Sequence, residues 1–87
     1  MNAKLIDRLL SFYSQVPSHK RQPYGKMIVM VQNGEALQAT EYARTWLDRC
    51  RHEYEVKGNA FWAQDFGIAG CLLNILTGKS QQIAESN

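Results

Sequence analysis

The sequence predicts an all-α fold, a compact single-domain bundle of about four helices. Three observations indicate this fold. Apolar residues recur every three or four positions along most of the chain, which is the period of an amphipathic helix. Proline or glycine marks the ends of these segments, and the connections between them are short enough to favour antiparallel neighbours. The predicted helices span residues 3–16, 23–33, 35–57 and 60–77.

Length and composition limit the possible classes of protein. A chain of 87 residues fills one hydrophobic core, so we expect one domain over residues 1–87. A hydrophobic content of 45% argues against disorder, and a net charge of +2 is too small to indicate a nucleic acid or an anionic membrane by itself. Because Asp7 and Arg8 interrupt the first apolar segment, no secretory signal is expected, and the predicted location is cytoplasmic.

The first predicted helix is strongly amphipathic. It is expected to end before Pro17, since a proline disfavours helical geometry in the residue that precedes it. The next residues, 18–22, include His19, Lys20 and Arg21 and are interpreted as an exposed basic linker. The apolar face of the helix is formed by Leu5, Ile6, Leu9, Leu10, Phe12, Tyr13 and Val16.

The second segment allows two interpretations. Pro23 at its start and Gly34 just past its end are typical of a helix over residues 23–33. Its β-branched residues and the pair Asn33-Gly34 instead favour a β-hairpin over residues 26–39, which would make the fold α+β. The helix is preferred, because the residues after the turn favour helix over strand.

The third segment, residues 35–57, is the longest predicted helix and is followed by Gly58. Charges of alternating sign on its outer side indicate a solvated face with weak ion pairs. Its inner side is formed by Ala36, Ala39, Ala43, Trp46, Leu47, Cys50 and Tyr54.

The fourth segment, residues 60–77, is apolar on almost every face, which is typical of a helix at the centre of a fold or at a subunit interface. Asn59 is the predicted N-cap, Gly78 the predicted end, and residues 79–87 a frayed tail. Its broad apolar face holds Trp62, Phe66, Ile68, Ala69, Leu72, Leu73, Ile75 and Leu76.

Small residues form a separate strip on this helix: Ala63, Gly67, Gly70 and Asn74. A glycine inside a helix costs up to about 1 kcal/mol relative to alanine, so the strip indicates close approach of another backbone. We prefer close packing against the long helix, with self-association and a ligand groove as the alternatives. Asp65, the one acid of this helix, is expected either on a narrow exposed strip or partly buried beside an arginine, tyrosine or tryptophan donor.

No arrangement of residues indicates catalysis, a cofactor or a metal. Thr77-Gly78-Lys79-Ser80 resembles the end of a phosphate-binding loop, but Leu73 stands where the first glycine is required. His52-Glu53 resembles the start of a zinc-protease helix, but Val56 replaces the second histidine. Cys50 and Cys71 are both expected to face the core as free thiols.

We therefore expect a non-catalytic interaction protein, a small self-associating adaptor, inhibitor or regulatory subunit. The predicted protein partner contacts the aromatic end of the last helix and the adjoining linker, and the predicted assembly is a homodimer. The partner-binding residues are Phe61, Trp62, Phe66, Gly67 and Gly70. The alternative is a nucleic-acid-binding regulator that uses His19, Lys20, Arg21 and Lys26 together with Arg44, Arg49 and Arg51. No membrane partner is expected, because the longest apolar segment is too short and too polar for a span.

Overall fold

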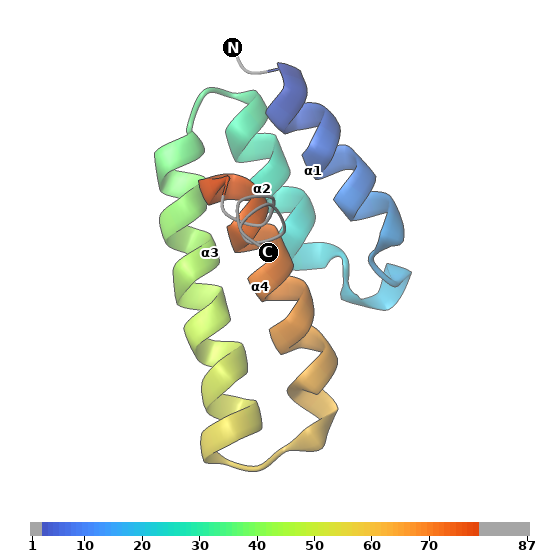
Figure 1. Ribbon diagram of the computed structural model, residues 1–87, viewed down its shortest axis with the longest axis vertical. Helices are drawn as coiled ribbons and strands as arrows, with labels where there is room; N and C mark the ends of the chain where they lie inside the picture. The colour runs from blue at the N-terminus through green and yellow to red at the C-terminus, as the bar shows by residue number, and fades with distance from the viewer. Residues whose placement is uncertain (1–2, 79–87) are drawn as a thin grey trace, which may run out of the picture.

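The computed structural model describes residues 3–78, which form four α-helices and three short helical turns with no strand among them (Figure 1). The predicted all-α bundle of about four helices is confirmed. The elements are α1 (Ala3–Gln15), η1 (Ser18–Lys20), α2 (Gln22–Gln32), α3 (Ala36–Arg51), η2 (His52–Val56), η3 (Ala60–Trp62) and α4 (Ala63–Thr77). The predicted tail at 79–87 lies outside the described residues.

The second segment is a helix, so the alternative hairpin over residues 26–39 is wrong. Pro23 lies in the first turn of α2, where its missing N–H is not needed for hydrogen bonding. At the other end the Asn33 amide donates to the Val29 carbonyl at 3.0 Å, and Gly34 adopts a φ of +85°. The Asn-Gly pair therefore ends a helix here, using the left-handed geometry that glycine allows.

The third predicted helix changes its hydrogen bonding before it ends. Residues 36–51 are α-helical, whereas η2 is a π-helical turn in which the Lys57 amide donates to the His52 carbonyl at 3.0 Å. Gly58 then reverses the chain with a φ of +69°. Asn59 is an N-cap as predicted, because its side chain accepts a hydrogen bond from the Phe61 amide, although the first turn after it is a 3₁₀ turn.

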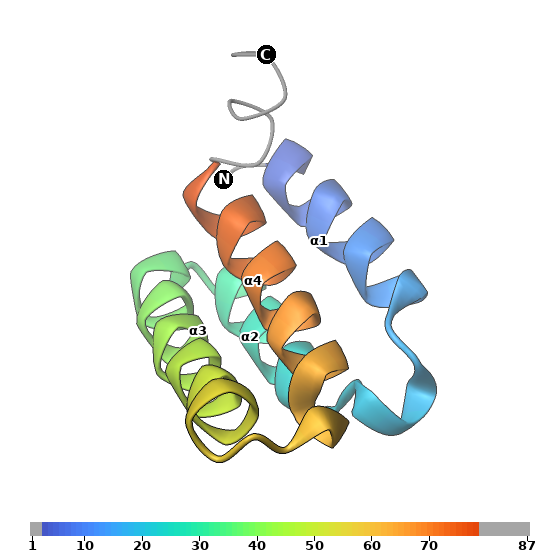
Figure 2. The ribbon, with the colours of Figure 1, turned by 60° about the horizontal axis from the view of Figure 1, so that its bottom comes forward.

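The four helices contact one another in cyclic order: α1 packs on α2, α2 on α3, α3 on α4, and α4 back on α1. Figure 2 shows α4 lying between α1 and α3. The first turn of α1 and the last turn of α4 line a common groove, with Lys4 on one side and Thr77 on the other. The buried apolar residues come from all four helices and from the turn after α1: Leu9, Phe12, Val16, Tyr24, Met27, Ile28, Val31, Ala39, Ala43, Cys50, Ala69, Leu72 and Ile75.

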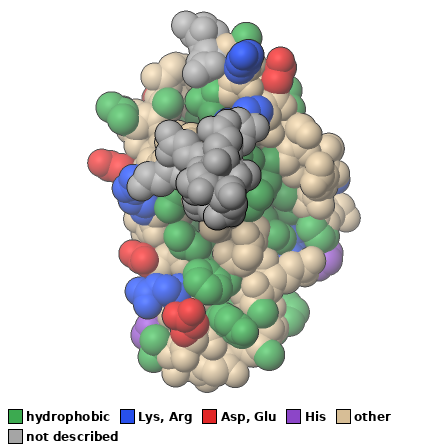
Figure 3. All heavy atoms as spheres, in the orientation of Figure 1, with side chains coloured by type: hydrophobic (Ala, Val, Ile, Leu, Met, Phe, Trp, Pro, Cys, Tyr) green, Lys and Arg blue, Asp and Glu red, His purple; other side chains and the backbone are tan. Residues whose placement is uncertain are grey.

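Despite its apolar composition, α4 buries one narrow stripe. The buried positions are Asp65, Ala69, Leu72 and Ile75, spaced by four and three residues as expected for one face of a helix. Most of the other large apolar residues of α4 are half-buried. Figure 3 shows hydrophobic side chains gathered over α4 on one face of the molecule, with charged side chains mainly along α3 and near the start of α1. None of the helices within residues 3–78 combines the length and apolar composition needed to cross a membrane.

Candidate interaction site

A buried ion pair joins the turn after α1 to the beginning of α4. The Lys20 ammonium lies 2.7 Å from the Asp65 carboxylate, and the two side chains retain 8% and 11% of their exposure. Asp65 is therefore buried and paired, but with a lysine rather than with an arginine, tyrosine or tryptophan. The prediction that residues 18–22 form an exposed linker is wrong for Lys20, because its side chain is buried and its ammonium pairs with Asp65.

Local hydrogen bonds explain how Lys20 reaches Asp65. Pro17 ends α1, and the following 3₁₀ turn is closed by the Lys20 amide, which donates to the Pro17 carbonyl at 2.8 Å. The Arg21 guanidinium donates to the carbonyls of Val16 at 2.7 Å and Ser14 at 3.2 Å. Because these carbonyls at the end of α1 lack helical partners, Arg21 acts as its side-chain cap. The two basic residues thus fix the turn from both sides.

A second hydrogen bond lies beside the ion pair. The Trp46 indole N–H donates to the Tyr24 hydroxyl at 2.9 Å, and the two rings meet edge to face with centroids 6.5 Å apart. Tyr24 is fully buried, and burial raises the pKa of its hydroxyl to about 12. The tyrosine therefore stays neutral and serves as a polar contact within the core, joining α2 to α3.

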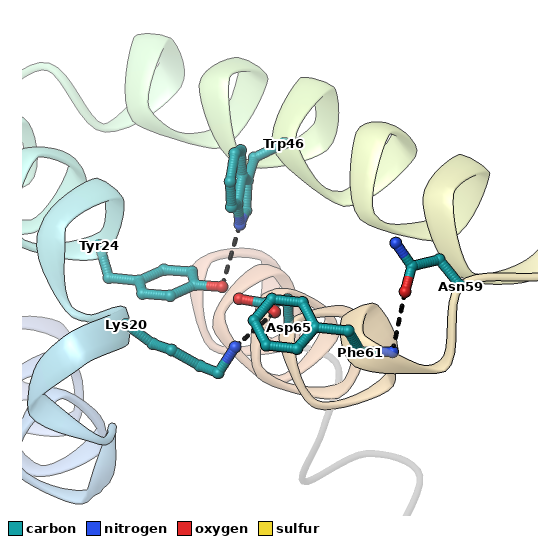
Figure 4. A network of polar contacts seen from close by, with 6 residues as sticks. All are labelled: Lys20, Tyr24, Trp46, Asn59, Phe61 and Asp65. Atoms are coloured by element: carbon teal, nitrogen blue, oxygen red, sulfur yellow. Dashed lines mark hydrogen bonds and ion pairs between the residues drawn. The ribbon is translucent and has the colours of Figure 1, made fainter. Parts of the chain in front are cut away.

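Phe61 lies above this network and is itself exposed. Its ring centroid is 4.7 Å from the Lys20 ammonium, which is within the range of a cation–π contact, yet 72% of the residue is exposed. Its backbone is fixed, since the Phe61 amide donates to the Asn59 side chain at 3.1 Å. In Figure 4 the phenyl ring overlies the ion pair, while the Trp46–Tyr24 hydrogen bond lies beside it.

These groups surround a small pocket of about 240 Å³, which we call the aromatic pocket. The structure thus brings the predicted aromatic residues Phe61 and Trp62 together with His19 and Lys20 of the basic segment. The lining residues are His19, Lys20, Gln22, Pro23, Trp46, Phe61, Trp62 and Asp65.

The other predicted contact residues lie elsewhere. The Phe66 ring packs 6.0 Å from the ring of Tyr54. The Arg21 guanidinium lies 5.3 Å from the centroid of Tyr13, and the Lys26 ammonium 5.2 Å from the centroid of Tyr42. The basic residues proposed for a nucleic acid therefore do not form one cluster, and two of them, Lys20 and Arg21, are engaged within the molecule.

Gly67 and Gly70 face open space, so the interpretation that α4 packs closely against the long helix at this strip is wrong. A Cβ atom built at either position would meet no atom within 4 Å. Gly67 instead lines a groove of about 400 Å³ between α1 and α4, which we call the α1–α4 groove. Cys71, expected in the core, lines the same groove and is exposed. The groove residues are Phe12, Gln15, Val16, Gln64, Gly67, Ile68 and Cys71.

The buried ionisable groups are either paired or held in one protonation state. The Asp65 carboxylate forms an ion pair with the Lys20 ammonium. Burial raises the pKa of the Cys50 thiol to about 11, which keeps the thiol protonated. Within residues 3–78 no three histidine, cysteine or acidic side chains come close enough together to hold a metal ion. Comparison with known protein families, characterised proteins and solved structures finds no match for this chain.

The sequence contains partial signals for this site. Asp65 is conspicuous as the one acid in an apolar helix, and Lys20 lies in a basic segment, but nothing local pairs residues 45 positions apart. Trp46 fits the inner face of its helix, yet its hydrogen bond to Tyr24 depends on how α2 and α3 are packed. Tertiary packing, which has no local signal, assembles the pocket.

Proposed function

We propose that this protein is a non-catalytic protein-binding module whose partner docks at the aromatic pocket. The single observation that carries the proposal is the exposed Phe61 ring held over a buried ion pair. Aromatic residues are enriched in the centres of protein interfaces, where a large apolar ring is covered by the partner. The turn η2, which contacts the turn that holds Phe61, adds exposed apolar area through Val56, which is 64% exposed.

Pre-organisation supports the same proposal. The backbone around Phe61 is held by the Asn59 cap, and the floor of the pocket by the Lys20–Asp65 pair. A surface that is fixed before binding loses less conformational entropy when a partner arrives. The module therefore suits the role of a small adaptor, inhibitor or regulatory subunit. Its two free thiols, one of them exposed, suit a reducing compartment such as the cytoplasm.

Affinity capture from the native host tests this proposal. We would compare the wild-type chain with Phe61→Ala and with Leu37→Ala, a matched loss of an exposed apolar side chain in the first turn of α3. The proposal expects a set of proteins retained by the wild type and by Leu37→Ala and lost with Phe61→Ala. Identical sets for all three chains would contradict it.

We also propose self-association through the α1–α4 groove. The groove residues are mostly apolar and none of them is charged, so two copies can face each other across the groove without like-charge repulsion. Gly67, which lines the groove, leaves room there for a second helix. Sedimentation of the wild type and of Gly67→Leu tests the dimer, with Trp62→Ala as a change in the aromatic pocket. We expect Gly67→Leu to weaken the dimer and Trp62→Ala to leave it intact; a monomer throughout would contradict this.

A further inference from the structure

One face of α3 carries a strip of rings with a cation at each end. Tyr42, Trp46 and Arg49 are spaced by four and three residues, so they share this face. The Lys26 ammonium lies 5.2 Å from the Tyr42 centroid, and the Arg49 guanidinium lies 6.0 Å from the Trp62 centroid. Trp46 and Trp62 line the aromatic pocket, so Arg49 lies at its edge, and Lys26 lies at Tyr42, one helical turn before Trp46. The two cations therefore flank the pocket along α3.

Neither flanking cation has a carboxylate partner within residues 3–78, and both residues are exposed. The acids in the neighbourhood do not compensate them. Asp65 is paired with Lys20, and Glu53 with Lys57 at 3.2 Å. Two further acids, Glu41 and Asp48, each precede a strip residue by one position, which turns them about 100° away around the helix. The strip therefore presents uncompensated positive charge at both ends.

From this arrangement we propose that the partner inserts an acidic segment, in which two carboxylates flank one apolar side chain. The inference rests on the proposed function and names the chemistry of the partner. The apolar side chain enters the aromatic pocket, and the carboxylates meet Lys26 and Arg49. Tyr42 and Arg49 are seven residues apart, which is about 10 Å along a helix. Side chains of an extended peptide alternate between its two faces, so the apolar residue and the two acids that flank it on one face take positions i+2, i and i+4. These positions span about 13 Å, a distance that side chains as long as those of Lys26 and Arg49 can match.

The contacts of the rings favour a protein segment over a single-stranded nucleic acid. Bases stack on free aromatic faces, along a groove with enough cations to follow the phosphates. Here Lys26 and Arg49 already lie against the rings of Tyr42 and Trp62, and Trp46 meets Tyr24 edge to face. Two flanking cations match two carboxylates and are few for a phosphate backbone.

Titration with designed peptides tests the inference. The probes are three short extended peptides that share a central leucine and carry two glutamates, two glutamines or two lysines, one placed two positions before the leucine and one two positions after it. The readout is the pair of indole N–H signals of Trp46 and Trp62 in a nitrogen-15 correlation spectrum. We expect saturable shifts with the glutamate peptide. Its affinity should exceed that of the glutamine peptide by about tenfold at low salt, since two exposed ion pairs are gained, and high salt should reduce the difference.

The double variant Lys26→Gln/Arg49→Gln should lower the affinity for the glutamate peptide to that for the glutamine peptide. It should leave the glutamine peptide unaffected. The matched control is Arg44→Gln/Arg51→Gln, which removes two cations from α3 outside the strip and should retain the preference for glutamate. Circular dichroism checks that each variant remains helical.

Several outcomes would overturn the inference. Equal affinity for all three peptides, or preference for the lysine peptide, would contradict an acidic partner segment, but docking at the aromatic pocket would still be supported. Absence of any shift at millimolar peptide would also overturn it, yet loss of captured proteins with Phe61→Ala would still support the proposed function. Tighter binding of an oligothymidylate, abolished by the Lys26/Arg49 variant, would assign the strip to nucleic acid instead.

Discussion

The aromatic pocket and the α1–α4 groove lie along the same helix but differ in how they are made. The pocket is built from contacts: a buried ion pair, a tyrosine–tryptophan hydrogen bond and a ring above a cation. The groove is left open at Gly67, which lines it and has no side chain, and no atom of the described residues would lie within 4 Å of a Cβ there. The difference teaches that a surface can be fixed by polar contacts or left open by glycine. Substitution should lower the stability of the protein in the first case and raise it in the second.

The largest expected effect is in the pocket. Asp65→Ala would leave the Lys20 charge buried without a partner, and we expect a loss of about 3–5 kcal/mol in the free energy of unfolding. Urea denaturation followed by circular dichroism measures it. The double change Lys20→Met/Asp65→Leu removes both charges and should recover most of the loss. A loss below about 1 kcal/mol for Asp65→Ala would mean that the pair is effectively solvated.

The next effect is a loss of stability at alkaline pH. Burial raises the pKa of Cys50 from 9.0 to about 11 and that of Tyr24 from 10.0 to about 12. Above pH 9 the unfolded chain therefore releases protons that the folded chain keeps, so stability falls as pH rises through the window from 9 to 12. By pH 11 the loss should be roughly 2–4 kcal/mol, at about 1.4 kcal/mol per unit of difference for each group.

Urea midpoints between pH 8 and pH 11 measure this loss, and Tyr24→Phe should reduce the part that develops above pH 10, the ordinary pKa of tyrosine. A midpoint that stays constant up to pH 11 would show that neither group is protected by burial.

A smaller effect of opposite sign is expected at the two glycines on the outer side of α4. Gly67→Ala and Gly70→Ala should each raise the free energy of unfolding by about 0.5–1 kcal/mol, because alanine is a better helix former and its Cβ meets nothing within 4 Å. Gly25→Ala is the matched comparison, because its Cβ would lie 3.2 Å from the Tyr13 hydroxyl oxygen. We therefore expect a smaller gain in the free energy of unfolding for this variant. Thermal unfolding at a concentration where the protein is monomeric separates stability from association. Destabilisation by both the Gly67 and the Gly70 variant would contradict the open space at these positions.

The smallest effect concerns the thiols. Cys71→Ser should change stability by less than about 0.5 kcal/mol, because the side chain is exposed. In the folded protein a disulfide-exchange reagent should modify Cys71 rapidly and Cys50 at the rate of unfolding, since Cys50 is fully buried. Counting modified thiols by mass spectrometry over time checks this. Two equally fast thiols would contradict the assigned burial of Cys50.

Periodicity predicted the helices well, because the spacing of Leu9 and Phe12, or of Ala39 and Ala43, is a local property of the sequence. Pairing of Lys20 with Asp65 is not local, and a charged residue in a short polar segment is usually solvated. A glycine inside a helix indicates lost helix propensity, but the sequence does not say what the glycine is for. Gly67 and Gly70 therefore fit a close contact and an open surface equally well. The helices were therefore predictable from the sequence. The contacts that form the aromatic pocket and the open space of the α1–α4 groove were not.

The first turn of α1 and the last turn of α4 line one groove, which has a consequence for chain connectivity. A short linker from Gly78 to Ala3 would close the described chain into a ring. New ends could then be cut between Gly34 and Glu35, both of which are exposed. Such a circular permutant retains all four helix pairs, so its folding would show that the packing of the helices, rather than their order along the chain, determines this structure.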